Sequence, residues 1–173
     1  MNERLVIIDA GPSLNFCATS TERLMLDVLR SAGTVLAPDV VSREVLNRSR
    51  DTRRFGPARQ KWQGLVSSGH IQTLVSDPSD ERLVAAVDRV AGIPIEARLK
   101  RSKDLGEVMV VAQAIVHRDA GDHVVVLIDD GYGQDLAALE ELEVISTERI
   151  LVRAARRGLI ANRADMRKLY ERM

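Results

Sequence analysis

The chain has 173 residues, of which 45% are hydrophobic, and its 25 Lys and Arg residues balance 25 Asp and Glu residues. This length and apolar content suit one domain, which we expect to span residues 1–173, and the zero net charge points to no class of partner. The single cysteine excludes a disulfide within the chain and fits a reducing cytoplasm. The apolar runs are too short for a signal peptide or a membrane span, so we expect a cytoplasmic protein that does not contact membranes.

Short apolar runs alternate with amphipathic segments along the first half of the chain. The run at residues 5–8 predicts a buried strand that ends directly at Asp9, and Gly11-Pro12 predicts a turn behind it. The later elements of this half are expected, in chain order, as a helix over 20–29, a strand over 34–37, a helix over 38–46 and a strand over 71–75.

The second half continues the alternation. Its expected elements are a helix over 79–90, an apolar helix over 104–116, a strand over 123–128, a helix over 135–142, a strand over 144–145 and two closing helices split by Gly158. Strands that alternate with helices predict a parallel sheet covered on both faces. We therefore expect an α/β fold, a single three-layer domain with a central parallel sheet of four to five strands flanked by helices. The C-terminal helices, residues 147–173, are expected to pack on this domain or to contact a second copy or another protein.

Two of the predicted strands end in aspartate. Asp9 follows the first strand, and Asp129 and Asp130 follow the strand over 123–128. In an open α/β sheet, catalytic and binding groups collect beyond the carboxyl ends of the strands. Asp9 alone could cap the next turn. Two adjacent carboxylates repel each other, however, and a divalent cation would offset that repulsion best.

Three further acidic residues each have a structural and a functional interpretation. Glu44 borders the apolar face of its predicted helix, where it either joins a site or pairs with a neighbouring arginine at the rim. Asp104 and Glu107 have the spacing of a helix capping box, which is a purely structural role. The positive end of the helix dipole favours carboxylates at this position in either case.

Taken together, these side chains form a set of hard oxygen ligands. His70, His117 and His123 show no metal-ligand spacing with one another or with Cys17. Oxygen ligands without histidine or cysteine suit Mg²⁺ or Mn²⁺ rather than zinc. Clustered carboxylates that hold such ions are a recurring device for in-line attack on phosphodiesters.

The acidic positions fall in motifs that resemble those of the PIN-domain nucleases, in particular VapC-like toxins and their relatives. The resemblance covers nearly the whole chain and rests on Val6-Ile7-Ile8-Asp9-Ala10-Gly11-Pro12 with Leu14-Asn15-Phe16, Val40 with Glu44-Val45, Leu105-Gly106-Glu107, Leu127-Ile128-Asp129-Asp130 and Arg157-Gly158-Leu159-Ile160. It implies a ribonuclease that depends on Mg²⁺ or Mn²⁺, is often a homodimer and is often held by a small antitoxin protein. The residues that it implies are Asp9, Glu44, Glu107 and Asp130 for catalysis and metal binding, Asp104 and Asp129 as further metal ligands, and Asn15 in support.

The sequence departs from this family pattern at two positions. Relatives commonly have Ser or Thr two residues after the first Asp, where this chain has Gly11. A basic residue often follows the paired aspartates, where this chain has Gly131-Tyr132-Gly133-Gln134. Neither departure removes a carboxylate. Asp104 and Glu107 both remain candidates for the third acid; Glu107 matches the Leu-Gly-Glu pattern better, with Asp104 as its helix cap.

Two basic regions could contact RNA. One includes Arg43, Arg48, Arg53 and Arg54 and leads to Trp62, an arrangement that could follow an RNA backbone and stack a base. The alternative is a solvated helix pair with Trp62 in the core. The C-terminal region is also basic and could contact phosphates, an acidic antitoxin or only solvent; its cationic residues are Arg149, Arg153, Arg156, Arg157, Arg163, Arg167 and Lys168.

Three functions remain open from the sequence. The first is a metal-dependent endoribonuclease, as the toxin of a toxin–antitoxin pair. The second is a PIN-like module that binds RNA or protein without cleaving. The third is a phosphatase-like enzyme with Asp9 as nucleophile, which is disfavoured because that class places a second Asp where this chain has Gly11.

Overall fold

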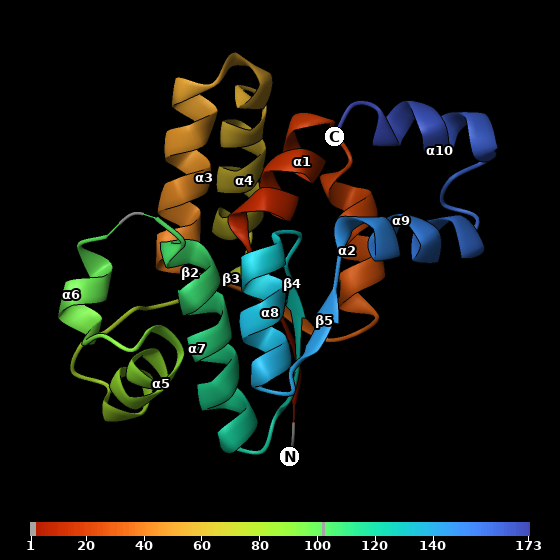
Figure 1. Ribbon diagram of the computed structural model, residues 1–173. Helices are drawn as coiled ribbons and strands as arrows, with labels where there is room; N and C mark the ends of the chain where they lie inside the picture. The colour runs from red at the N-terminus through yellow and green to blue at the C-terminus, as the bar shows by residue number, and fades with distance from the viewer. Residues whose placement is uncertain (1–2, 102) are drawn as a thin grey trace.

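The computed structural model describes residues 3–101 and 103–173, which form a five-stranded parallel sheet between helical layers (Figure 1). The spatial order of the strands is β3-β2-β1-β4-β5. Their bounds are β1 Arg4–Ile8, β2 Thr34–Pro38, β3 Gln72–Leu74, β4 His123–Leu127 and β5 Glu143–Ile145. The predicted three-layer α/β fold with a parallel sheet is therefore confirmed.

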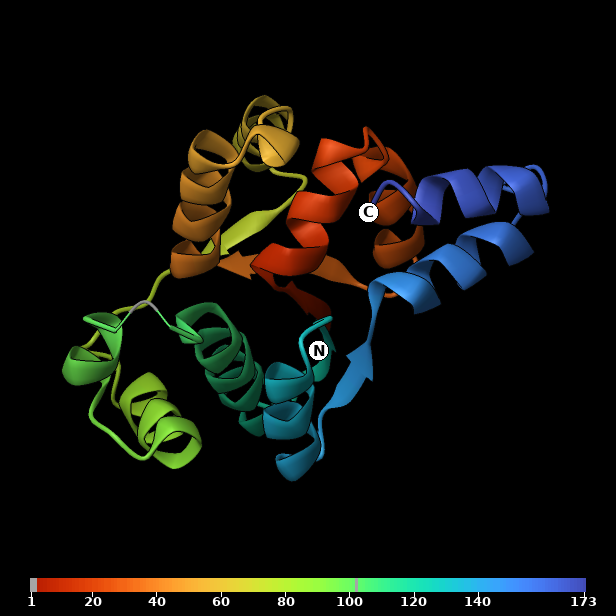
Figure 2. The same cartoon turned by 45° about the horizontal axis from the view of Figure 1, so that its top comes forward.

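The helices cover both faces of the sheet. Figure 2 shows α1, α2, α3 and α4 on one face and α5, α6, α7 and α8 on the other. The helical segments are α1 Ala10–Ala18, α2 Glu22–Arg30, α3 Asp39–Asp51, η1 Arg53–Phe55, α4 Ala58–Ser67, α5 Glu81–Ala91, α6 Ile95–Leu99, α7 Leu105–Asp119, α8 Gly131–Leu139, α9 Thr147–Arg156 and α10 Arg163–Tyr170. Because helices bury both faces, β1 and β4 are almost entirely apolar, as is usual for central parallel strands.

The C-terminal helices lie beside α2 at the β5 end of the sheet (Figures 1 and 2). Arg157, at the end of α9, donates hydrogen bonds to the carbonyl of Asp27 and to the hydroxyl of Ser31, and so ties α9 to α2. Arg149 donates to the carbonyl of Val144 in β5. These two arginines therefore have structural partners within the domain.

The predicted turn at Gly11-Pro12 is wrong, because both residues lie in the first turn of α1. A proline is tolerated there, since the first N–H groups of a helix have no partner within it. α1 thus begins immediately after Asp9, and the chain makes no separate turn.

Three other helices differ from the sequence prediction. The Arg-rich region contains α4, whose buried Trp62 belongs to the core, as the second interpretation of that region holds. α6 was not expected. α8 begins at Gly131, earlier than the predicted Asp135, because Asp130 caps it through a hydrogen bond from the N–H of Tyr132.

No helix in the described part of the chain is both long and apolar enough to cross a membrane.

A glycine allows β2 to begin close to β1. A Cβ on Gly33 would lie 2.2 Å from the carbonyl oxygen of Arg4, which is backbone and cannot swing aside. We expect Gly33→Ala to lower the free energy of unfolding by about 1–3 kcal/mol, measured by urea denaturation.

The matched control is Gly64→Ala in the middle of α4, where the added Cβ would meet nothing within 4 Å apart from its chain neighbours and the backbone of its own helix. Alanine is the better helix former, so this variant is expected to gain up to about 1 kcal/mol. Equal stability of the two variants would contradict the packing described for Gly33.

Candidate active site

The connections that follow β1 and β4 run to opposite faces of the sheet, although the two strands are neighbours. The chain leaves β1 for α1 on one face and leaves β4 for α8 on the other face (Figure 2). The two strands pair in register up to Ile8 and Leu127, and the N–H of Asp9 donates to the carbonyl of Leu127 at 3.0 Å. Such a change of face between neighbouring strands opens a crevice at the carboxyl edge of the sheet, where α/β proteins bind their ligands.

Asp9 is buried at this edge, with 4% of its surface exposed. Its Oδ2 caps α1 by accepting a hydrogen bond from the N–H of Gly11 at 3.3 Å. Its Oδ1 is also buried and has no hydrogen-bond partner among the described residues. A buried carboxylate oxygen without a donor is costly, and it marks a position where an external group would be stabilised.

Glu44 of α3 faces Asp9 across the start of α7. A Cβ on Gly106 would lie 3.0 Å from Glu44 Oε2 and 3.1 Å from Asp9 Oδ1, so both oxygens converge on the same small region. The other oxygen of Glu44 accepts a hydrogen bond from Arg48 at 3.2 Å. Glu44 thus pairs with an arginine at the rim and also turns one oxygen toward Asp9.

Glu107 lies in the first turn of α7 and leans against α8. A Cβ on Gly133 would lie 3.0 Å from Glu107 Cγ, so the glycine permits this contact. Asp130 is exposed at the N-cap of α8, and its Oδ1 accepts a hydrogen bond from Tyr132 N–H at 2.9 Å. Figure 1 shows the starts of α1, α7 and α8 gathered at this end of the sheet.

Burial, together with neighbouring negative charges, raises the pKa of Asp9 and of Glu107. Burial raises the pKa of Asp9 from 3.8 to about 7, and the charges of Glu107 and, more weakly, Glu44 act in the same direction. The N–H groups at the start of α1 oppose this shift. The pKa of Glu107 is also raised, first by burial, against its own backbone N–H, and then by the charges of Glu44, Asp130 and Asp104. The four acids at the sheet edge, Asp9, Glu44, Glu107 and Asp130, are hereafter the acid cluster.

Asp129 and Asp104 are placed differently from these four. Both oxygens of Asp129 accept hydrogen bonds from Thr147, one from its backbone N–H and one from its hydroxyl, so this carboxylate holds the start of α9. Asp104 occupies the N-cap position of α7 with a positive φ of 54°, and its side chain makes no capping hydrogen bond. The predicted capping function of Asp104 is therefore wrong, and its charge instead adds to that around Glu107.

The other predicted residues lie at different distances from the acid cluster. Asn15 is half-buried in α1, and its backbone carbonyl accepts hydrogen bonds from Thr19. Arg43 and Arg48 line a groove of about 450 Å³ together with Glu44 and Gly106.

Arg53 and Arg54 belong to η1, at the far end of α3. The guanidinium of Arg54 lies 5.2 Å from the ring centre of Phe55. Arg43 and Arg48 therefore flank the acid cluster, whereas Arg53 and Arg54 do not.

Basic residues between α6 and α7, which the sequence motifs did not single out, also lie beside the acid cluster. Lys100 lines the groove beside Glu44, and Arg101 and Lys103 line a smaller cavity beside Asp104. The signal was present in the sequence, because these cations stand directly before the Leu105-Gly106-Glu107 motif.

The acid cluster offers a divalent cation few direct ligands. Among residues 3–101 and 103–173, no three His, Cys, Asp or Glu side chains are arranged to bind one ion together. Magnesium usually binds through one or two carboxylates and keeps several water molecules. The unpartnered Asp9 Oδ1 and the nearby Glu44 Oε2 would supply such a pair.

Comparison with known proteins gives one family. The family model DUF3368, described as a PIN domain, matches residues 5–173. No curated protein matches the chain. The matched residues include every member of the acid cluster.

The raised pKa of Asp9 predicts how the metal-free protein responds to pH. Between about pH 4 and pH 7 the folded state keeps a proton that the unfolded chain has released, so stability falls as pH rises through this range. Asp9→Asn removes the titrating carboxyl group and therefore this loss of stability. We expect its melting temperature in EDTA at pH 8 to exceed that of the wild type, with a smaller difference at pH 4.

Asp88→Asn, at an exposed position on α5, is the control and should match the wild type at both pH values. If Asp9 served only as a helix cap, Asp9→Asn would instead leave the melting temperature almost unchanged at both pH values, because Asn and Asp are about equally good N-caps.

Proposed function

We propose that this chain, which belongs to the PIN-domain family of nucleases, is a metal-dependent endoribonuclease that hydrolyses RNA phosphodiester bonds. One observation carries the proposal. The buried Asp9 Oδ1 lacks a hydrogen-bond donor among the described residues and faces Glu44 Oε2, where a cation would compensate both oxygens.

The residues of the acid cluster have distinct functions in this proposal. A bound Mg²⁺ or Mn²⁺ would lower the pKa of a coordinated water and offset charge on the transferring phosphate. Asp9 and Glu44 hold that ion. Glu107, half-buried and with a raised pKa, is suited to accept the proton of the attacking water. Asp130, exposed at the N-terminus of α8, completes the cluster on the solvent side.

Cationic side chains beside the acid cluster suit an RNA substrate. Arg43, Arg48 and Lys100 line the groove that contains Glu44. Their charges would bind the phosphates on either side of the cleaved bond, because guanidinium and ammonium groups form strong charge-assisted hydrogen bonds with phosphate oxygens. Arg53 and Arg54, in η1 beyond the end of α3, would contact RNA only if it extended along the whole of α3.

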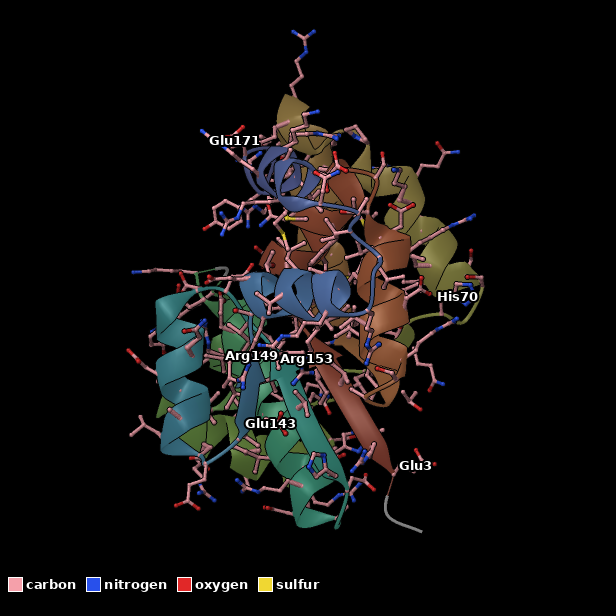
Figure 3. All side chains as sticks on the ribbon, turned by 90° about the vertical axis from the view of Figure 1, so that its right-hand side faces the viewer. Glu3, His70, Glu143, Arg149, Arg153 and Glu171 are labelled. Carbon is pink, nitrogen blue, oxygen red and sulfur yellow. The ribbon has the colours of Figure 1, made fainter. Side chains whose placement is uncertain are left out.

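We further propose that the protein is a VapC-like toxin of the cytoplasm, a homodimer whose partner is a small antitoxin. The basic C-terminal helices support this proposal, since Arg156 of α9 and Arg163 and Lys168 of α10 are exposed and available to an acidic protein, whereas Arg149 and Arg157 bind within the domain. Figure 3 shows Arg149 and Arg153 on α9, near the edge strand β5. A small acidic reading frame directly upstream of the gene would support the assignment.

A PIN-like module that binds without cleaving is the second candidate. It is favoured by the arrangement of the carboxylates, because no three metal-binding side chains of the described residues can bind one ion together. Gly11 points in the same direction, since it lacks the hydroxyl that relatives commonly have. The two candidates differ in one measurement, which is metal-dependent cleavage.

We expect cleavage of a structured RNA that has unpaired segments in Mg²⁺ or Mn²⁺, and none in EDTA. Glu44→Gln keeps the shape and the acceptor for Arg48 but removes the charge, so kcat/KM is expected to fall about 100-fold or more. The control Glu148→Gln, exposed on α9, should cleave like the wild type. A folded wild type that cleaves no RNA in either metal would leave only the binding module.

Gly11 offers a gain-of-function test. A Cβ at this position would lie 3.6 Å from Asp9 Oδ2, which is an ordinary contact, so a larger residue fits. We expect Gly11→Ser to lower the Mn²⁺ concentration needed for half-maximal activity several-fold, because its hydroxyl can join the hydrogen bonds around the ion.

Gly11→Ala adds the same Cβ without the hydroxyl and is expected to behave like the wild type. If alanine and serine had equal effects, the hydroxyl would have no function at this site.

A further inference from the structure

A second cavity lies beside the acid cluster, and the proposed ribonuclease function does not yet involve it. It has a volume of about 220 Å³. Its lining combines the apolar side chains of Ala91 and Ile93 with Tyr132, Arg101, Lys103 and Asp104. An apolar floor, one aromatic ring and several charges together are characteristic of a site for a ligand with a flat ring and an anionic group.

Tyr132 is fixed next to the acid cluster by the backbone. Its N–H donates to Asp130 Oδ1 at 2.9 Å, so its Cα stays within one helical turn of that acid. Its side chain is 45% exposed although it stands on the well-packed start of α8. Gly133, on the same turn, leaves no room for a Cβ beside Ile128 and so holds α8 close to the sheet. The aromatic ring is thus presented to solvent from a rigid base.

A buried arginine fixes the cationic side of the cavity. Arg98 is 6% exposed, and its guanidinium donates to the backbone carbonyls of Arg101, at 3.2 Å, and of Lys103. These bonds hold the two carbonyls on the inside, while the side chains of Arg101 and Lys103 line the cavity. The lining therefore has three cationic side chains, those of Arg98, Arg101 and Lys103, and one carboxylate, that of Asp104. This excess of positive charge favours an anionic ligand.

A nucleotide of single-stranded RNA matches this lining. Tyrosine rings stack on unpaired bases, and such stacking tolerates any base. Arg101 and Lys103 suit a phosphate. Asp104 connects the two sites, because it lines this cavity and its charge acts on Glu107. A strand with one phosphodiester at the acid cluster would have its neighbouring nucleotide within reach.

We propose that this cavity is a nucleotide subsite, in which Tyr132 stacks on an unpaired base next to the cleaved phosphodiester and Arg101 and Lys103 bind its phosphate. The subsite rests on the proposed ribonuclease function and specifies its substrate as single-stranded RNA. It also assigns Tyr132 as the residue that positions the strand.

The test uses a single-stranded RNA oligonucleotide that contains 2-aminopurine, with the full chain in EDTA so that no cleavage occurs. Stacking on the ring should quench the fluorescence of the probe. Tyr132→Leu is expected to weaken binding about tenfold, within the range that base–aromatic stacking supplies, and to abolish the quenching. Tyr132→Phe keeps the ring and should retain both.

The chain provides a matched control, because its other tyrosine, Tyr170, is 61% exposed on α10. Tyr170→Leu should bind and quench like the wild type. Arg101→Ala should weaken binding and reduce its salt dependence by about one phosphate contact, whereas Arg163→Ala on α10 should change neither.

Two further measurements separate this inference from the proposed function. Tyr132→Leu should raise KM with little effect on kcat, and Mn²⁺ should raise its melting temperature as much as it raises that of the wild type, because Tyr132 holds no metal. If the wild type cleaves no RNA but Tyr132→Leu still loses binding and quenching, the subsite stands and the ribonuclease proposal fails. If Tyr132→Leu binds RNA as the wild type does, or the wild type binds none, the subsite is wrong.

Discussion

The buried carboxylate of Asp9 determines the electrostatics of the candidate active site. Asp9 is held at the carboxyl end of β1 with one oxygen that no described residue satisfies, and the charges that act on its pKa, those of Glu107 and Glu44, are also negative. A fold can keep such a group only if the carboxylate binds a proton or if a cation from outside compensates it. With a pKa of about 7, Asp9 can do either near neutral pH. The proposed metal is therefore a consequence of the electrostatics of Asp9 and does not depend on the family resemblance alone.

The rest of the architecture brings the other acids to Asp9. Parallel pairing of β1 with β4 sets Asp9 and Asp130 at one edge, and α3 and α7 add Glu44 and Glu107. Two glycines make the approach possible, since a Cβ at Gly106 or Gly133 would press against these side chains. The starts of α1, α7 and α8 point their partial positive charge at the same region, which offsets part of the repulsion before any ion binds.

The sequence predicted what depends on local pattern and missed what depends on tertiary contacts. Apolar runs that end in aspartate identified both central strands and the edge of the sheet at which Asp9 and Asp130 lie, because strand burial and the carboxyl-end rule are local signals. The cap assigned to Asp104 failed because that residue takes a left-handed backbone conformation that spacing does not reveal. Asp129 looked equivalent to Asp130, but only the position of α9 shows that Thr147 binds it. The cations before α7 stand close to the Leu105-Gly106-Glu107 motif, but only the tertiary structure shows that Arg98 holds their backbone and that they share a cavity with Tyr132 of α8.

The most direct test of a cation at Asp9 is a crystal grown or soaked in Mn²⁺, with diffraction recorded near the manganese absorption edge. The account predicts an anomalous density peak within bonding distance of Asp9 Oδ1 and Glu44 Oε2, completed by water molecules, and no such peak in crystals of Asp9→Asn. A well-ordered site at millimolar Mn²⁺ without that peak, or with a hydrogen-bond donor from the chain itself on Asp9 Oδ1, would contradict it.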